Sequence, residues 1–169
     1  MNIVRIGLTF TIVTAAAVAQ QPAAPAAQAM KLFTTSAEVT ALIAKAKSER
    51  KGDAPIVTEN ILRMAPYNAS LEYRGAVGPA AVHETEAEFF YVIDGSATMI
   101  TGGKLTAEKR TNAANLTGTG IEGGQSRSIS KGDFIVVPEN TAHWFSKIDG
   151  TLVLMSLHVP RPVVPAAAK

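Results

Sequence analysis

Apolar residues in the first part of the chain recur at the spacing of an α-helix. The members of this row are Val39, Leu42, Ile43 and Ala46. Thr35 and Glu38 have the spacing of a capping box, in which a hydroxyl and a carboxylate satisfy free backbone N–H groups. Because Gly52 follows the last apolar position, the pattern predicts one helix over residues 36–51. Its apolar stripe is expected to pack against the outside of the remaining fold or against a second subunit.

After the helix, the pattern changes to short runs of β-branched and aromatic residues separated by Gly, Pro and Asn. These runs cover residues 56–64, 70–75, 88–93, 96–101, 127–130, 134–137, 143–146 and 152–159. Short strands with turn signals between them predict an all-β domain built as a double-sheet barrel or sandwich. Asp94-Gly95 has the composition of a tight hairpin turn between two of these strands. The sequence has no internal repeat, so a single barrel is expected.

One long segment, residues 102–125, interrupts the series of strands. It is polar and rich in Gly, Thr and Asn, which predicts a long loop in place of a hairpin connection. Long loops often carry function, so a lid over a pocket and a subunit contact are both open. Its glycines do not lie between a strand and a helix, which argues against a phosphate-binding loop.

The N-terminus has the composition of a secretory signal peptide over residues 1–19. One basic residue, Arg5, precedes an apolar run, and small residues at positions 17–19 supply the cleavage pattern. The run is short for a membrane span, so an uncleaved anchor is the less favoured alternative. We therefore expect a periplasmic or secreted protein that has no contact with the membrane after cleavage.

Composition divides the remainder into three segments. Residues 20–33 are rich in Pro, Ala and Gln and predict a flexible linker. Residues 34–160 contain the helix and all the predicted strands, and they suffice for one domain with a hydrophobic core. Residues 161–169 are similar to the linker in composition and predict a tail.

Charge and cysteine content narrow the function. The chain has 16 Lys and Arg against 14 Asp and Glu, and the net charge of +2 is scattered along the sequence. A nucleic-acid partner is therefore not expected. Cysteine is absent, which excludes disulfides, thiolate zinc sites and iron–sulfur clusters.

The candidate chemistry lies in two short patterns in the second half of the chain. The first contains His83 and Glu88 on either side of a break before a predicted strand, and the second ends at His143. Two imidazoles and one carboxylate are the ligand set of non-haem iron centres, and the same set suits zinc or manganese. The alternative is that both histidines are simply hydrogen-bonded in a polar pocket.

These two patterns resemble the motifs of the cupins, a family of small β-barrels. The matching residues are Gly75, His83, Glu88 and Gly95 in the first motif and Gly132, Pro138 and His143 in the second. Ala81 is a serious departure, because it stands where the family has its first histidine and a methyl group cannot bind a metal. Asn140 replaces a glycine at a turn, which is mild because Asn tolerates left-handed backbone, and Lys147 replaces the last asparagine. A register that puts Thr85 in the place of the second histidine would lose the match at Gly75.

The resemblance implies an all-β double-stranded β-helix, the jelly-roll barrel of the cupins, with one N-terminal α-helix. It implies that His83, Glu88 and His143 hold a divalent metal ion, with iron, manganese, zinc and nickel all open. Phe90 and Val92 share the strand parity of Glu88, and Phe145 shares that of His143. These three apolar side chains are therefore expected to line the substrate pocket.

The function expected from the resemblance is that of an exported single-domain cupin acting on a small organic molecule. An oxygenase, a lyase and an isomerase all fit. Ala81 supports an alternative, a non-catalytic periplasmic cupin that binds a metal or ligand at a degenerate site. His158, in the last predicted strand, could face the barrel and replace the missing ligand, but a lone histidine in an apolar strand is more often structural. Cupin-like barrels commonly pair, so a homodimer is expected.

Overall fold

The computed structural model describes residues 29–161 of the chain. The predicted signal peptide at 1–19, most of the predicted linker and residues 162–169 of the predicted tail lie outside the described residues. Within residues 29–161, no helix is both long enough and apolar enough to cross a membrane.

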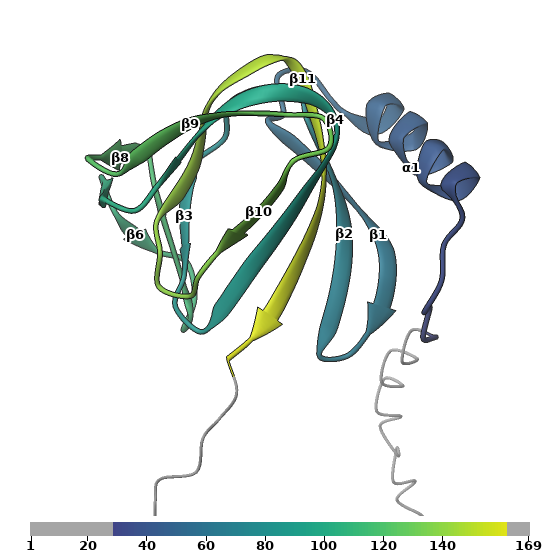
Figure 1. Ribbon diagram of the computed structural model, residues 1–169, viewed down its shortest axis with the longest axis horizontal. Coiled ribbons are helices and arrows are strands. Elements are labelled where there is room, and N and C mark those ends of the chain that lie inside the picture. The colour runs from purple at the N-terminus through teal and green to yellow at the C-terminus, as the bar shows by residue number, and fades with distance from the viewer. Residues whose placement is uncertain (1–28, 162–169) are drawn as a thin grey trace, which may run out of the picture.

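One helix and eleven strands make up the described part of the chain (Figure 1). The elements are α1 (Ser36–Glu49), β1 (Ile56–Met64), β2 (Tyr67–Arg74), β3 (Ala80–His83), β4 (Glu86–Thr101), β5 (Lys104–Thr106), β6 (Lys109–Arg110), β7 (Asn115–Gly118), β8 (Gly120–Glu122), β9 (Gln125–Ser130), β10 (Phe134–Val137) and β11 (His143–Pro160).

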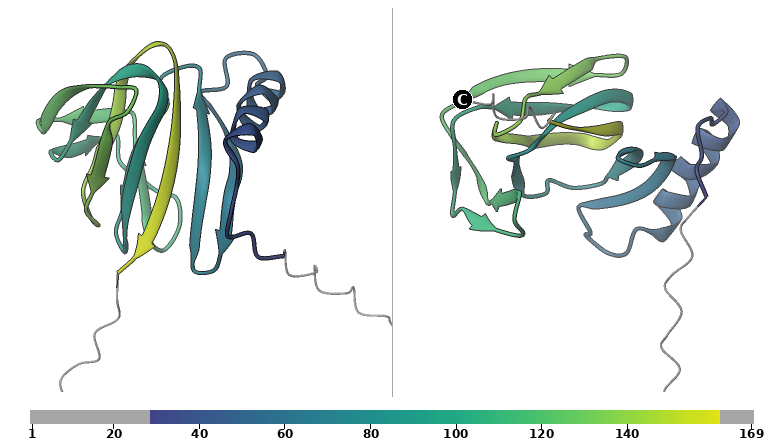
Figure 2. Two further views of the ribbon diagram at one scale, coloured as in Figure 1. Left: turned by 45° about the vertical axis from the view of Figure 1, so that its right-hand side comes forward. Right: turned by 90° about the horizontal axis from the view of Figure 1, so that it is seen from below.

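Helix α1 begins where the sequence predicts and ends two residues early, at Glu49. The hydroxyl of Thr35 accepts a hydrogen bond from the backbone N–H of Glu38, whose carboxylate accepts from the backbone N–H of Thr35. The predicted capping box is therefore confirmed. The apolar stripe packs on the outer face of β1 and β2, where Ala46 is fully buried beside Leu71 (Figure 2).

The long strands β4 and β11 lie antiparallel along most of their lengths and form the middle of the fold (Figure 1). Strand β11 also pairs with β2, and β2 pairs with β1. The other partners of β4 are β9 and β10. At its first residue β11 pairs with β3, which pairs with β7, and β7 pairs in turn with β6. All the pairings are antiparallel, and they confirm the predicted β fold with one N-terminal helix.

The predicted hairpin at Asp94-Gly95 is wrong, because β4 continues through both residues. Gly95 has a φ of +85°, and a Cβ atom at that position would overlap the carbonyl oxygen of Thr151 on β11. Glycine is required here for the close passage of two strands, not for a reversal of the chain. Strand β11 is also continuous through residues 147–151, which lie between the predicted strands 143–146 and 152–159.

The predicted long loop over residues 102–125 is also wrong. The segment contains the short strands β5 to β8, and its glycines at 102, 103, 123 and 124 all have positive φ, which suits them to the turns. Strand β7 pairs with β3 and places Asn115 opposite His83. The segment therefore contributes directly to the surroundings of a candidate site residue.

The inward faces of β4, β9, β10 and β11 enclose a hydrophobic core. Its buried members include Phe90, Val92, Phe145 and Leu154. Phe89 points outward and is 42% exposed, so the strand parity predicted from the sequence is confirmed for β4. Toward the beginning of β4, the same inward row changes from apolar to polar side chains.

Candidate metal centre

All three histidines of the chain meet at one carboxylate. His83 ends β3, Glu88 lies near the start of β4, and His143 and His158 lie near opposite ends of β11. Strand β11 arches over the barrel, so that residues of its two ends reach the same region (Figure 1). Its register places His158 opposite Glu88.

The imidazole nitrogens surround both oxygens of the Glu88 carboxylate. Nε2 of His83 and Nε2 of His143 lie 3.3 and 3.1 Å from Oε2, and Nε2 of His158 lies 3.2 Å from Oε1. Glu88 is only 3% exposed, and its Oε2 atom accepts no well-aligned hydrogen bond. Because a buried carboxylate oxygen without a partner is costly, a cation at this point would stabilise the arrangement.

Two of the imidazole rings are oriented by acceptors behind them. Nδ1 of His83 lies 2.7 Å from the side-chain oxygen of Asn115, and Nδ1 of His143 lies 3.3 Å from the carbonyl oxygen of Thr141. Since both oxygens are acceptors, Nδ1 carries the proton, and a neutral ring then presents the lone pair of Nε2 to Glu88. Lone pairs that face a carboxylate repel it, unless a proton or a metal ion lies between them. Outer acceptors of this kind are typical of metal-binding histidines.

Within the described residues, His83, Glu88 and His158 could together hold a metal ion, because their ligand atoms all lie within 4.8 Å of one another. The sequence predicted His83, Glu88 and His143, and the structure brings these three together but adds His158. His143 contacts Glu88 without belonging to the tighter group. Strand parity could have found His158, which lies four residues after the fully buried Leu154 on the inward row of β11.

The electrostatics of the site favour an ionised carboxylate. Burial alone would raise the pKa of the Glu88 carboxyl, but the three imidazoles beside it hold that pKa well below its usual range. Burial lowers the pKa of His83, yet Glu88 and Asn115 together raise it above the ordinary value. The pKa of His158 is also raised, chiefly by Glu88. The carboxylate thus holds a negative charge that either an imidazolium or a metal ion must balance.

Two departures from the cupin motifs, Ala81 and Asn140, lie close to the histidine cluster. Ala81 lies directly opposite His143 in the pairing of β3 with β11, so position 81 is next to the cluster. Asn140 has a φ of +56°, which confirms that Asn supports the left-handed turn. Its backbone N–H donates to the carbonyl oxygen of His83 at 2.7 Å and so ties the second motif to the first.

The three apolar residues expected in the pocket lie in the hydrophobic core behind the histidines. Phe90 and Phe145 pack edge to face with ring centroids 5.4 Å apart, Val92 is fully buried, and the ring centroid of Phe90 lies 6.0 Å from that of His143. Beside the histidines, a polar cleft of about 460 Å³ opens to solvent. Its lining residues are Asn60, Pro66, Asn68, Ser70, His83, Glu86, Asn115 and His158.

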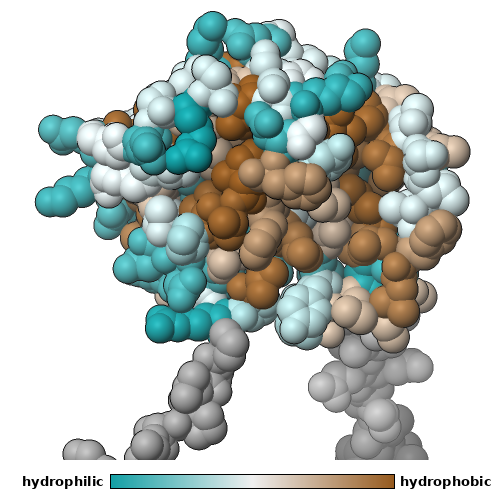
Figure 3. Space-filling model, in the orientation of Figure 1, coloured by the Kyte–Doolittle hydropathy of each residue, from teal (hydrophilic) through white to brown (hydrophobic). Residues whose placement is uncertain are grey.

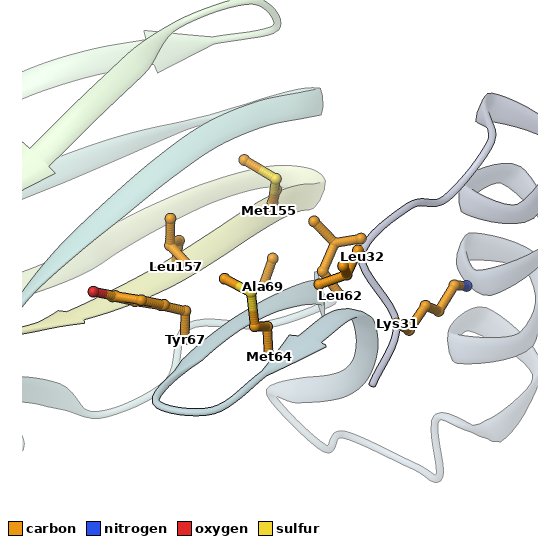
Figure 4. A pocket seen from close by; sticks show the side chains of 8 residues that line it. All are labelled: Lys31, Leu32, Leu62, Met64, Tyr67, Ala69, Met155 and Leu157. Carbon is orange, nitrogen blue, oxygen red and sulfur yellow. The ribbon is translucent and has the colours of Figure 1, made fainter. Parts of the chain in front are cut away.

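A second cavity lies on the outer face of the fold and has a different character. It measures about 340 Å³ and lies between the segment before α1 and the strands β1, β2 and β11, with side chains such as Leu62, Met64 and Leu157 (Figure 4). It belongs to a face on which apolar residues gather broadly (Figure 3). No histidine lines this cavity, which we call the outer groove. A large apolar surface is more typical of protein contacts than of catalysis.

The Cupin family model matches residues 55–162, which is more than half of the chain. The chain belongs to the cupin family. Solved cupin-like structures similar to it include KdgF from Halomonas sp., with 20% identity, 67% of this chain and 87% of that chain covered, and a TM-score of 0.48. The cupin domain of Cnp3 from Schizosaccharomyces pombe is 12% identical, with 68% of this chain and 71% of that chain covered and a TM-score of 0.47. The Fe(II) form of HppE is 16% identical, with 65% of this chain and 54% of that chain covered and a TM-score of 0.49. None of the curated proteins matches this cupin.

Proposed function

We propose that this cupin binds a divalent metal ion and acts on a small organic molecule in the adjoining cleft. His83, Glu88 and His158 would hold the ion, and His143, which lies beside the same carboxylate oxygen as His83, would be a further ligand. The observation that carries the proposal is the convergence of every histidine of the chain on one buried carboxylate. A set of imidazoles and one carboxylate suits iron, manganese, zinc or nickel.

The chain's own residues would prepare the site for this chemistry. When bound, the ion would supply Lewis acidity or a redox-active centre at the end of the cleft. Asn115 and the carbonyl of Thr141 fix two of the rings, and the packed rings of Phe90 and Phe145 exclude water from the side of the core. Glu86, the carboxylate among the cleft-lining residues, lies with its Oε2 atom 3.1 Å from Nδ1 of His158 and would help to orient that ring. An oxygenase, a lyase and an isomerase all fit these roles.

A non-catalytic cupin with a degenerate site is the second candidate, and Ala81 is the feature that favours it. The position of His158 weighs against degeneration, because this side chain supplies an imidazole to the cluster from another strand. Its Nε2 atom lies 3.2 Å from Glu88, as close as the nitrogens from the two motifs.

Metal analysis of the purified full chain tests the proposal. The protein must carry no histidine tag, since a tag would bind metal in its own right. Each candidate ion is added in turn, excess is removed by desalting, and the bound metal is measured by elemental analysis. We expect about one ion per wild-type chain and less than about a tenth of that in His83→Ala and His158→Ala, since each removes a ligand.

Glu84→Gln is the matched control. Glu84 is adjacent to His83, but its carboxylate pairs with the guanidinium of Arg110 at 2.9 Å, away from the cluster. This variant should keep the wild-type metal content. Failure of the wild-type chain to take up any ion would sink the metal proposal, and full occupancy in His158→Ala would remove His158 from the ligand set.

We also propose that the protein is exported and forms a homodimer through outward apolar side chains of β4 and β10. Phe134 and Val136 on β10 are 79% and 54% exposed, and Val136 lies opposite Phe89 on β4, so the three side chains form one outward cluster. Light scattering of the purified protein should give twice the chain mass, and Phe134→Glu should give the single mass, because a charge would be buried in the interface. A monomeric wild-type protein would contradict this proposal.

A further inference from the structure

We infer that the polar cleft beside the metal centre binds a neutral, polyhydroxylated compound, of the class of monosaccharides and polyols. This inference names a substrate class for the proposed metal-dependent function and relies on that function for the reaction alone. Its basis is the set of side chains that line the cleft beside the histidines: amides and a hydroxyl from three different strands, with neither Lys nor Arg among them.

One wall of the cleft comes from the hairpin of β1 and β2. Asn68 and Ser70 lie on the same face of β2, whereas Ala69 between them is buried on the opposite face under α1. Asn60 lies opposite Ser70 in the register of β1 and β2. Strand β7 supplies Asn115 from the side of the histidines. Three carboxamides and one hydroxyl therefore line a single space.

The chemistry of these side chains matches that of vicinal hydroxyl groups. A carboxamide offers two N–H donors and one acceptor oxygen, so it can donate to one hydroxyl of a ligand and accept from its neighbour. The oxygen of Asn115 is taken by Nδ1 of His83, which leaves the amide N–H groups of Asn115 for a ligand. A ligand with one hydroxyl could use only a fraction of these groups.

The charge of the cleft favours a neutral ligand. Neither Lys nor Arg lines it, and Glu86 contributes a negative charge at its edge. A divalent ion would be balanced by the carboxylates of Glu86 and Glu88, so an anionic ligand would find no further positive charge. Anionic substrates are usually recognised through Arg or Lys, which form charge-assisted hydrogen bonds with them.

The size of the cleft and its contrast with the outer groove support the same class. A volume of about 460 Å³ lies within the usual range of small-molecule sites, on the order of 300–1,000 Å³. The outer groove has a similar volume but is lined by Leu, Met and Tyr. Three carboxamides are thus gathered at the cavity that adjoins the histidines, whereas none lines the outer groove.

Binding measurements on the full metal-loaded chain test the inference. The probes are D-glucose, D-mannose and myo-inositol as neutral polyols, D-gluconate as a carboxylate, and cyclohexanol as a largely apolar compound with one hydroxyl. Calorimetry or ligand-observed NMR should show that at least one neutral polyol binds at least about tenfold more tightly than gluconate or cyclohexanol. The double variant Asn60→Ala/Asn68→Ala should weaken that binding by about tenfold or more, because the loss of two amides removes several hydrogen bonds.

The metal content of each sample separates this inference from the proposed function. Asn68 lies opposite His158 in the register of β2 and β11, but neither Asn60 nor Asn68 is hydrogen-bonded to a histidine, so the double variant should keep the wild-type metal content. Ser128→Ala on the exposed strand β9 should change neither the metal content nor the polyol affinity. If the chain binds no metal but a polyol still binds through the two amides, the proposed function fails and this inference stands. Tighter binding of gluconate, no binding of any polyol, or unchanged polyol affinity in the double variant would overturn it.

Discussion

The interior of the barrel has a polar end and an apolar end, although the same strands build both. On β4 the inward row passes from Glu88 to Phe90 and Val92, and on β11 the buried His143 is followed two residues later by the buried Phe145. At the polar end the side chains converge on a carboxylate, and at the apolar end they fill space. One local rule, the alternation of side chains along a strand, therefore positions both the hydrophobic core and the candidate metal ligands.

The two ends should therefore fail in different ways when they are altered. Loss of packing at the apolar end should lower the free energy of unfolding and leave the metal affinity of the folded protein unchanged. Loss of a ligand at the polar end should abolish metal binding at a smaller cost in stability.

The largest effect on stability is expected from Leu154→Ala at the apolar end. Leu154 is fully buried, so the substitution leaves a cavity and should lower the free energy of unfolding by about 2–5 kcal/mol. Urea denaturation of the metal-free protein measures this change. Leu32→Ala is the matched control, because Leu32 is 63% exposed and the same substitution there should cost less than about 0.5 kcal/mol. A large loss of metal affinity in folded Leu154→Ala would show that the two ends are not separable.

The next effect is expected from Glu88→Gln at the polar end. The amide keeps the shape of the carboxylate but removes the charge that balances the ion, so the variant should lose metal binding. At a free metal concentration about a hundredfold above the dissociation constant, the wild-type protein gains about 2.7 kcal/mol of stability. Thermal unfolding with and without chelator should show this gain in the wild type and none in Glu88→Gln. An equal shift in both proteins would mean that the ion binds elsewhere.

The apolar end was more predictable from the sequence than the polar end, and the reason is physical. Alternation is a local property, so the burial of Phe90, Val92 and Phe145 follows from their positions within single strands. The convergence of His143 with His158 depends on a strand that arches, which is set by pairing with β2 and β4 and not by local sequence.

Two errors in the sequence prediction have related causes. Gly95 has the composition of a hairpin turn but serves a close passage of β4 past β11, and this need becomes visible only when both strands are in place. Asn115 lies in the segment that the sequence predicted as a long loop, so its role was not predicted. Its contact with His83 arises from the pairing of β7 with β3. The motif positions His83, Glu88 and His143 needed no such long-range information.

A third prediction exchanges the position of one ligand within the polar end. His158→Ala should lower metal affinity by more than about a hundredfold, because removal of a ligand should cost more than the 10–100-fold loss that is typical of an outer partner. Adding Ala81→His should restore affinity, because position 81 lies directly opposite His143 in the register. Isothermal titration with zinc compares the three proteins. Ser128→His, on the exposed strand β9, controls for the mere addition of a histidine.

Moving the histidine from position 158 to position 81 tests whether both positions reach the same metal centre. Recovery with Ala81→His but not with Ser128→His would show that His158 and position 81 serve the same centre from different strands. Equal behaviour of the two added histidines would show that position 81 has no special access to the cluster.

The smallest effect on metal affinity is expected from Asn115→Ala, because Asn115 acts on the metal centre only through its contact with His83. Without the acceptor at 2.7 Å, the ring of His83 can rotate or change its tautomer, and metal affinity should fall by about 10–100-fold, or about 1.4–2.7 kcal/mol. Asn115→Asp keeps an acceptor at this position and should retain affinity. Thr117→Val is the control, because Thr117 lies on the same face of β7 but donates to the carbonyl of Ala80, not to a histidine. NMR of the His83 Nδ1 proton gives a second readout, and its persistence in Asn115→Ala would show that another group orients the ring.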